Sequence, residues 1–237
     1  MSGIVDFHSH ILPGIDDGSA SVEESVAMLQ LEASQGIRKV VATPHFYPRH
    51  DEPEKFLARR AKAEMRLRQA LGEHKDIPEI ICGAEVYFFS GISDCDALPE
   101  LTIEGKGYIL IEMPPSPWTH QMYAELEEIR ARWDIVPIIA HVDRYMSLLN
   151  THGIPQRLEE LPVLVQANAG FFLRAASRAR ALRMLENDQI QLLGSDCHNL
   201  TSRPPNLEKA LQIIERHSMA EAVRRVESYQ EQVLSGG

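Results

Sequence analysis

The chain has 237 residues and a formal net charge of −10, from 34 acidic and 24 basic side chains. This balance argues against a nucleic-acid-binding protein, and the apolar runs are shorter than the roughly 18 residues that a membrane span needs. The first residues lack the basic and apolar regions of a signal peptide, and three cysteines at irregular spacing argue against a disulfide framework. We therefore expect a cytoplasmic protein without membrane insertion, formed by one domain over residues 1–237.

Short apolar runs recur along the chain. They are rich in Val, Ile and Leu, which is typical of strands that are buried on both faces of a parallel sheet. The runs cover residues 4–7, 38–43, 79–84, 107–112, 136–140, 163–168 and 191–195. The sequence thus predicts seven strands.

Amphipathic helical patterns lie between most of these runs. The clearest patterns cover residues 21–36, 53–72, 201–217 and 219–234. Ser21 and Glu24 have the spacing of a capping box, Pro53 suits the first turn of a helix, and Gly72 suits a helix end. Alternating strands and helices predict a parallel α/β fold with right-handed crossovers, and seven strands favour a barrel over an open sheet.

An ionisable side chain that can bind a metal follows six of the seven predicted strands. In a parallel barrel the carboxyl ends of all strands lie on one face, so these residues would meet there. They are His8 and His10, His45, Glu85, Glu112, His141, and Asp196 with His198, while Asn168 follows the remaining strand. Imidazole nitrogens and carboxylate oxygens are ligands that Mn, Fe or Zn accept. The sequence therefore predicts a metal cluster.

Several motifs resemble those of the polymerase-and-histidinol-phosphatase (PHP) superfamily: DFHSH, TPH, GAE, IEMP, AHVDRY and GSDCHN. Within it, HSHILPGIDDGS and SDCHNLTSRPP are similar to the metal-dependent bacterial tyrosine phosphatases of capsule and exopolysaccharide operons. The resemblance runs from Asp6 to Pro205, and its long first motif is more specific than D-x-H-x-H, which amidohydrolases and deoxyribonucleases share. It implies a distorted seven-stranded (βα)7, TIM-like PHP barrel.

The resemblance also implies three divalent ions, usually Mn²⁺, with Fe, Zn, Co or Mg as other possibilities. It gives the first ion His8, His10, Glu85 and Asp196; the second Glu112, His141 and the bridging Glu85; and the third Asp17, His45 and His198. Asp17, rather than Asp16, matches the third-ion ligand, and Asp16 is interpreted as a turn residue. Arg144 and Arg203 match the phosphate-facing arginines of the family, in keeping with the planar fork that a guanidinium offers to phosphate oxygens.

The predicted reaction is hydrolysis of a phosphate monoester by a metal-activated hydroxide. The resemblance implies that the substrate is a phosphotyrosine protein, namely the C-terminal tail of a bacterial tyrosine autokinase that controls capsular or exopolysaccharide synthesis. A tyrosyl leaving group, with a pKa of about 10, departs more readily than an alkoxide, so no general acid is assigned. Four aromatic residues either flank the substrate ring or belong to the core: Tyr87, Phe88, Phe89 and Trp118.

Three alternatives compete with a metal-dependent tyrosine phosphatase. Residues 197–203 have the C-x5-R spacing of cysteine-dependent phosphatases, but Asp196 would raise the pKa of the Cys197 thiol, and Pro204 follows the arginine. We expect Cys197 to be a packing residue whose side chain points away from the ligands. Another PHP phosphoesterase, acting on histidinol phosphate or a nucleotide, would share the metal ligands. A non-catalytic metal-stabilised scaffold would not need both arginines.

Overall fold

The strands form a curled parallel sheet in the computed structural model, which describes residues 4–72, 76–146 and 153–236. One part has the order β1-β2-β4, made of Val5–Ser9, Lys39–Ala42 and Glu79–Cys82. The other has the order β3-β5-β6-β7-β8-β9, made of His45–Phe46, Glu85–Tyr87, Tyr108–Glu112, Val136–Ile139, Leu164–Asn168 and Leu192–Gly194. All of these neighbours pair in parallel, which confirms the predicted α/β class.

Each predicted apolar run coincides with a strand, but the described residues form nine strands where seven were expected. The two additional strands, β3 and β5, lie just beyond β2 and β4. Pro44 and Gly83 occupy the gaps, and proline cannot donate a backbone hydrogen bond to a ladder. The amide of Gly83 donates to Ala42 O (2.9 Å) and the amide of Glu85 donates to Pro44 O (3.0 Å). These two bonds carry the pairing across the break.

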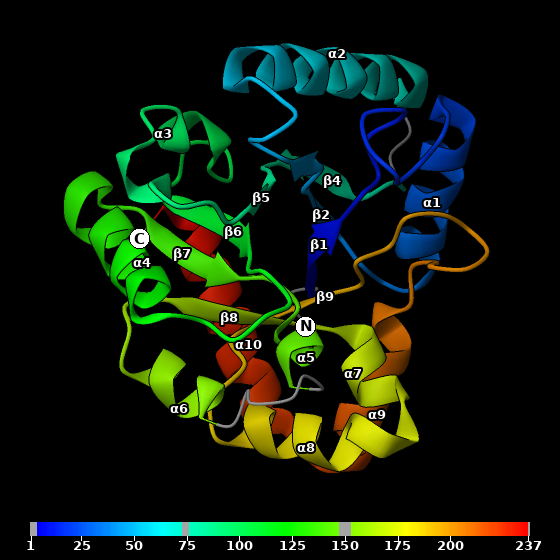
Figure 1. The fold of residues 1–237 in the computed structure, drawn as a ribbon. Helices are drawn as coiled ribbons and strands as arrows, with labels where there is room; N and C mark the ends of the chain where they lie inside the picture. Colours follow the sequence, from blue (N-terminus) through cyan, green and yellow to red (C-terminus); the bar gives the residue numbers. More distant parts are fainter. Residues whose placement is uncertain (1–3, 73–75, 147–152, 237) are drawn as a thin grey trace.

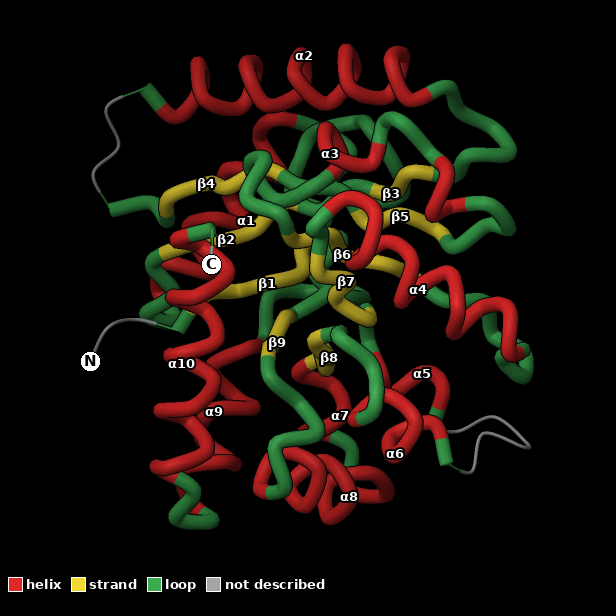
Figure 2. The backbone as a smooth tube through the Cα atoms, turned by 90° about the vertical axis from the view of Figure 1, so that its left-hand side faces the viewer, coloured by secondary structure: helices red, strands yellow, loops and turns green. Residues whose placement is uncertain are grey.

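The first and last strands of the chain lie side by side (Figures 1 and 2). The amide of Asp196 donates to His8 O (2.7 Å), and the amide of His10 donates to Cys197 O (2.9 Å). Ser9 and Cys197 also form a parallel bridge. These contacts join the two ends of the curled sheet just where the predicted ligands begin.

Helices surround the strands (Figure 1). Their bounds are Val22–Ser34 (α1), Pro53–Leu71 (α2), Leu98–Leu101 (α3), His120–Trp133 (α4), Val142–Tyr145 (α5), Ile154–Glu159 (α6), Ala169–Leu173 (α7), Ala175–Glu186 (α8), Leu207–Arg216 (α9) and Ala220–Ser235 (α10), with a 3-10 turn at Ile92–Asp94. The four predicted helices are present as α1, α2, α9 and α10. The start of α9 was expected at residue 201, but Pro204 and Pro205 delay it, because the residue before a proline avoids helical backbone angles.

The C-terminal helix α10 packs against the start of β1. The buried Gln230 side chain accepts a hydrogen bond from Val5 N (3.2 Å) and donates one to Val5 O (3.1 Å). Val233 of the same helix joins a core cluster with Phe7 and other strand residues. Val5 begins the strand whose other end leads to His10, so α10 covers the end of the sheet opposite the predicted ligands.

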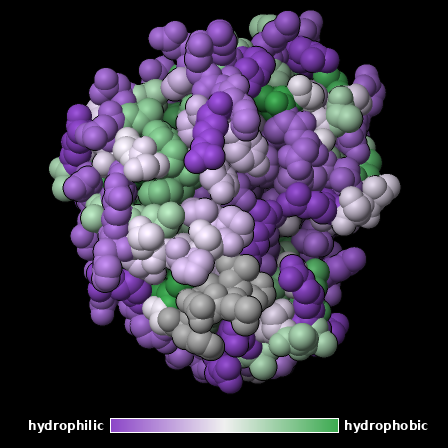
Figure 3. Space-filling view, in the orientation of Figure 1, coloured by the Kyte–Doolittle hydropathy of each residue, from purple (hydrophilic) through white to green (hydrophobic). Residues whose placement is uncertain are grey.

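The surface shown in Figure 3 carries mainly hydrophilic side chains. Among the helices of the described residues, none combines the length and the apolar character that crossing a membrane would require. The apolar side chains instead form the core between the sheet and the helices, with Phe46, Phe56 and Phe172 fully buried.

We expect Gly194→Ala to destabilise the protein more than Gly36→Ala. A Cβ at Gly194 would lie 2.6 Å from His8 Cβ and 2.8 Å from His8 N, and the backbone of β1 cannot easily shift. Gly36 has open space around it but a φ of +81°, so alanine there meets only backbone strain. Urea unfolding should show losses of about 2–3 and about 1 kcal/mol, respectively. Equal losses would contradict the close packing of β9 on β1.

Candidate metal centre

All nine residues predicted to bind metal lie together at the carboxyl-terminal side of the sheet. They come from β1 and the segment after it, from β3, β5 and β6, and from the segments after β7 and β9. These residues are His8, His10, Asp17, His45, Glu85, Glu112, His141, Asp196 and His198. Eight of them have side chains that are at most 11% exposed, and the Asp17 side chain is 67% exposed.

Glu85 lies at the centre of this cluster. Its Oε2 atom is 3.1 Å from His8 Nε2, 3.3 Å from His10 Nε2 and 3.0 Å from His45 Nδ1. Its Oε1 atom is 2.8 Å from His141 Nε2. One carboxylate therefore reaches four imidazoles from different parts of the chain, which is the arrangement that a bridging ligand needs.

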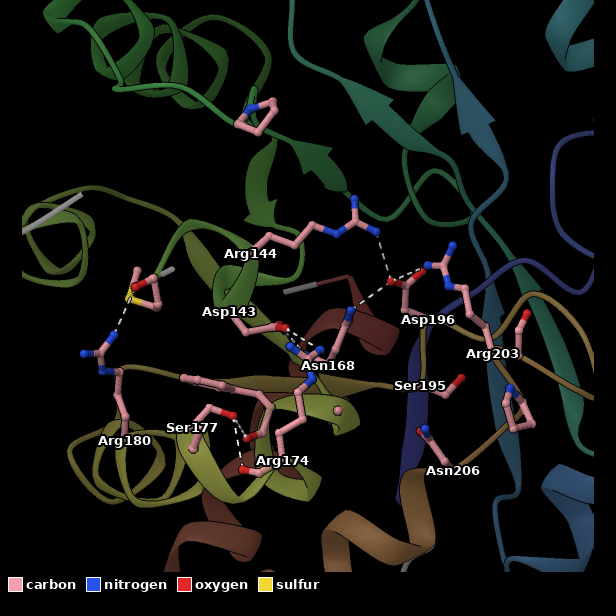
Figure 4. A pocket seen from close by; sticks show the side chains of 17 residues that line it. Asp143, Arg144, Asn168, Arg174, Ser177, Arg180, Ser195, Asp196, Arg203 and Asn206 are labelled. Carbon is pink, nitrogen blue, oxygen red and sulfur yellow. Dashed lines mark hydrogen bonds and ion pairs between the residues drawn. The ribbon is translucent and has the colours of Figure 1, made fainter. Parts of the chain in front are cut away.

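The carboxylate of Asp196 connects the imidazoles to the arginines. Its Oδ1 atom is 3.6 Å from His8 Nε2 and 3.5 Å from His10 Nε2. Its Oδ2 atom accepts hydrogen bonds from Arg144 at 3.3 Å and from Asn168 Nδ2 at 2.8 Å, and Arg203 lies 2.7 Å away (Figure 4). Arg144 also donates to Glu112 Oε1 (2.6 Å). Both predicted arginines therefore contact the edge of the cluster.

Within this cluster, three compact groups of side chains could each hold a cation. The groups are His8, His10 and Glu85; His10, Asp17, His45 and His198; and His45, Glu85 and Glu112. The first two overlap with the predicted first and third ion sites. The third group contains the two carboxylates predicted for the second ion, but with His45 in place of His141. His141 nevertheless lies close to both carboxylates: its Nε2 atom is 3.6 Å from Glu112 Oε1 and forms a hydrogen bond with Glu85.

Several buried polar atoms in the cluster have no hydrogen-bond partner within the described ranges. They are Glu85 Oε2, Glu112 Oε2, Asp196 Oδ1, His45 Nδ1, His141 Nδ1 and His198 Nε2. Burying such atoms without a partner costs free energy, and bound divalent cations would satisfy them. The nitrogen and oxygen donors also suit Mn, Fe or Zn. The residues present therefore fit a cluster of divalent metal ions.

The surroundings of Glu85 favour its charged form, whereas burial and the neighbouring Glu85 raise the pKa of Glu112. Burial would raise the pKa of Glu85, but the charge of His8, the neighbouring His10 and the hydrogen bond from His141 hold this pKa well below its usual range. Burial and the charge of His10 lower the pKa of His198 to about 4. Neutral imidazole is the form that binds metal, so His198 is ready to act as a ligand at neutral pH.

Asp16 has a role that its interpretation as a turn residue missed. Its Oδ1 atom accepts from Gly18 N (2.9 Å), as in an Asx turn, but its Oδ2 atom accepts from His45 N (2.9 Å) and pairs with His10 Nδ1 (2.8 Å). Burial opposes ionisation, yet the bond to His10 lowers the pKa of Asp16 to about 2. A carboxylate in this place fixes the ring and tautomer of a metal-binding histidine.

Two amide side chains of β8 were also missed as parts of the centre. Gln166 Oε1 accepts from His141 N (2.6 Å) and lies 3.3 Å from His8 Nδ1. Asn168, which follows the only predicted strand without an ionisable residue, donates to Asp196. This strand therefore orients residues that neighbouring strands supply.

Cys197 points away from the predicted ligands. Its side chain is fully buried, and its Sγ atom lies 4.0 Å from Glu32 Oε1 on α1. Burial and the nearby Asp6 raise the pKa of the thiol well above its usual range, which opposes thiolate formation. Burial and the neighbouring Asp6 also raise the pKa of Glu32, which favours its neutral form. These contacts agree with a packing role for Cys197.

The four predicted aromatic residues have different surroundings. Tyr87 lies next to Tyr47, with their ring centroids 5.7 Å apart. Tyr47 in turn stacks on His45 of the cluster, with a centroid distance of 4.9 Å. Phe88 is buried in the hydrophobic core, and the partly buried Phe89 packs against this core. Trp118 packs on Tyr123 and Tyr145. Tyr47, which the sequence analysis did not single out, is 39% exposed beside His45.

Comparison with known proteins decides the family. Residues 4–234 match the protein family described as capsular polysaccharide synthesis, CpsB/CapC. This chain belongs to the CpsB/CapC family. The match confirms the resemblance drawn from the sequence motifs.

The similarity to known tyrosine-protein phosphatases extends over most of the chain. It is 33% identical over 226 residues to the tyrosine-protein phosphatase CpsB of Streptococcus pneumoniae, with 89% of each chain covered. It is 27% identical over 221 residues to the tyrosine-protein phosphatase YwqE of Bacillus subtilis strain 168, covering 90% of this chain and 84% of YwqE.

A solved structure matches with a TM-score of 0.85 and 24% identity, covering 98% of this chain and 95% of the other. It comes from a study of YwqE from B. subtilis and CpsB from S. pneumoniae, described as unique metal-dependent tyrosine phosphatases. At this identity the match shows that the two chains share a fold.

We expect Asp16→Asn to weaken divalent-metal binding roughly 10- to 100-fold, because His10 loses the carboxylate that orients it. Calorimetric titration of the metal-free protein with Mn²⁺ would measure the change. Asp51→Asn is a suitable control, because its carboxylate pairs with Arg59 outside the cluster. Unchanged affinity in Asp16→Asn would contradict the orienting role of this carboxylate.

Proposed function

We propose that this protein is a metal-dependent protein-tyrosine phosphatase. The observation that carries the proposal is the convergence of nine nitrogen and oxygen donors beside Arg144 and Arg203. The relatives named as tyrosine-protein phosphatases support the reaction, and the metal dependence described for YwqE and CpsB supports its dependence on metal. The proposed reaction is hydrolysis of the phosphate monoester of tyrosine.

We propose three divalent ions, with manganese as the metal. The first would bind His8, His10, Glu85 and Asp196; the second Glu85, Glu112 and His141; and the third Asp17, His45 and His198. Divalent ions in such a cluster lower the pKa of water towards roughly 7 and offset the negative charge of phosphate. The buried carboxylate oxygens without hydrogen-bond partners support this assignment.

Arg144 and Arg203 bind and orient the phosphate in the proposed mechanism. Their side chains are 40% and 37% exposed, so a phosphate could reach both guanidinium groups. Asp196 holds the guanidinium groups of Arg144 and Arg203 at the rim of the cluster. These two adjacent groups can neutralise the charge that develops on the phosphate oxygens. Tyr47 and Tyr87 provide an aromatic surface next to His45 for the tyrosine ring.

The protein substrate in this proposal is the phosphorylated tail of a bacterial tyrosine autokinase, in the cytoplasm, during capsule or exopolysaccharide synthesis. The family description supports a role in capsular polysaccharide synthesis. We also propose one catalytic domain over residues 1–237. Counting β2 with β3 and β4 with β5 as single barrel positions gives seven, in keeping with a distorted (βα)7 barrel.

Chelation should abolish hydrolysis of p-nitrophenyl phosphate, and added Mn²⁺ should restore it. Cys197→Ser should retain wild-type activity within about threefold, because the buried thiol takes no part in the reaction. Initial rates, with metal content and circular dichroism on each sample, would check both expectations. Activity that is indifferent to chelator but lost in a folded, metal-loaded Cys197→Ser variant would contradict the proposal.

Replacing Arg203 by alanine should lower kcat/KM for a phosphotyrosine peptide by about 10²–10³-fold, the usual effect of removing one oriented donor. Arg203→Lys should recover only part of this loss, because lysine keeps the charge but lacks the planar fork. Arg183→Ala, on the exposed side of α8, provides a control with the same change in net charge. Full activity of Arg203→Ala would remove this residue from the mechanism.

A further inference from the structure

A hollow of about 810 Å³ extends from the two arginines of the proposed active site to the helices α7 and α8 (Figure 4). Arg144, Asp196 and Arg203 line one part of it. Arg174 and Arg180, which have no role in the mechanism above, line the part next to α8. A substrate whose phosphate contacts Arg203 would therefore have room to extend towards α8.

The lining of this hollow is positively charged, although the protein as a whole is acidic. It includes four arginines but only two acidic residues, Asp143 and Asp196, whereas the chain carries a net charge of −10. Both carboxylates already have partners, because Asp143 accepts a hydrogen bond from Asn168 N (3.2 Å) and Asp196 contacts Arg203. The hollow thus favours anions where most of the surface would repel them.

Arg174 and Arg180 have charge available for a ligand. The Arg174 side chain is 67% exposed and forms a long ion pair with Asp143, at 3.7 Å, which leaves most of its guanidinium open to solvent. The exposed Arg180 side chain donates a hydrogen bond to Met146 O, at 3.1 Å. Among the residues that the structure describes, no carboxylate pairs with Arg180, and a neutral carbonyl does not offset its positive charge.

The third arginine of this segment, Arg178, serves the fold instead. Its guanidinium donates to Phe172 O (3.0 Å) and Leu173 O (2.8 Å), and so caps the end of α7. Ser177 also holds the turn between the helices, because its hydroxyl donates to Phe171 O (2.7 Å). These bonds fix the turn between α7 and α8, where Arg174 lies, and Arg180 follows further along α8; both side chains line the hollow (Figure 4).

We propose that Arg174 and Arg180 form a specificity subsite that binds a second anionic group of the phosphoprotein substrate, next to the phosphotyrosine. This inference rests on the proposed phosphatase function. The chemistry that the subsite recognises is a carboxylate or a second phosphate, to which an arginine fork can donate two hydrogen bonds. The protein would thus prefer phosphotyrosine in an acidic segment of its substrate.

The test compares wild type with the double variant Arg174→Ala/Arg180→Ala, both loaded with Mn²⁺. Substrates are p-nitrophenyl phosphate and phosphotyrosine peptides flanked by Glu, by Gln or by a second phosphotyrosine. The double variant should lose about tenfold in kcat/KM on the Glu peptide, through KM, since two exposed ion pairs contribute only modestly to binding. It should keep wild-type rates on p-nitrophenyl phosphate and the Gln peptide. A loss confined to the doubly phosphorylated peptide would also support the subsite and identify its ligand as phosphate.

Two further variants sharpen the comparison. Arg174→Glu should shift the preference from Glu-flanked to Lys-flanked peptides, which a merely structural role would not do. Arg66→Ala removes an exposed arginine of α2, away from the hollow, and should leave all rates unchanged. Equal losses on Glu and Gln peptides, or on p-nitrophenyl phosphate, would overturn the subsite. Failure of metal-loaded wild type to hydrolyse any phosphotyrosine substrate would instead overturn the proposed function.

Discussion

The carboxylate of Glu85 is buried among four imidazoles, and the rest of the structure depends on holding it there. A charged carboxylate in this position is stable only because His8, His10, His45 and His141 lie around it. The four histidines come from different strands or strand ends, so the sheet must curl to bring them together. The contact between β1 and β9 then joins the two ends of the sheet and adds Asp196 to the cluster.

The sequence predicted the parts of the fold and the site that follow from local patterns. Apolar runs located all seven predicted strand positions, and each donor that directly follows a run proved to lie at the cluster. Regular strands predict this convergence because their carboxyl ends share one side of a sheet. The sequence missed α4 and α8. The strand count differed because short additional strands, β3 and β5, follow the breaks at Pro44 and Gly83.

Other parts depend on contacts between residues that no local pattern connects. Asp16 and Gln166 orient histidines through hydrogen bonds that exist only once the loops and strands are assembled. Tyr47 was missed because its place beside His45 depends on the strand break at Pro44. The predicted assignment of ligands to three separate ions came from the resemblance of the motifs. The spacing of the residues along the chain could not provide that assignment.

The breaks after β2 and β4 have a consequence for the entropy of metal loading. They place His45 and Glu85 inside short strands rather than in free loops, and the two residues are direct partners in the β3–β5 pairing. Their backbones are therefore already ordered before any ion arrives, so binding need not compensate for fixing them. More of the free energy of coordination is then retained as affinity. A centre built in this way would not need to refold its backbone at His45 and Glu85 in order to take up a metal ion.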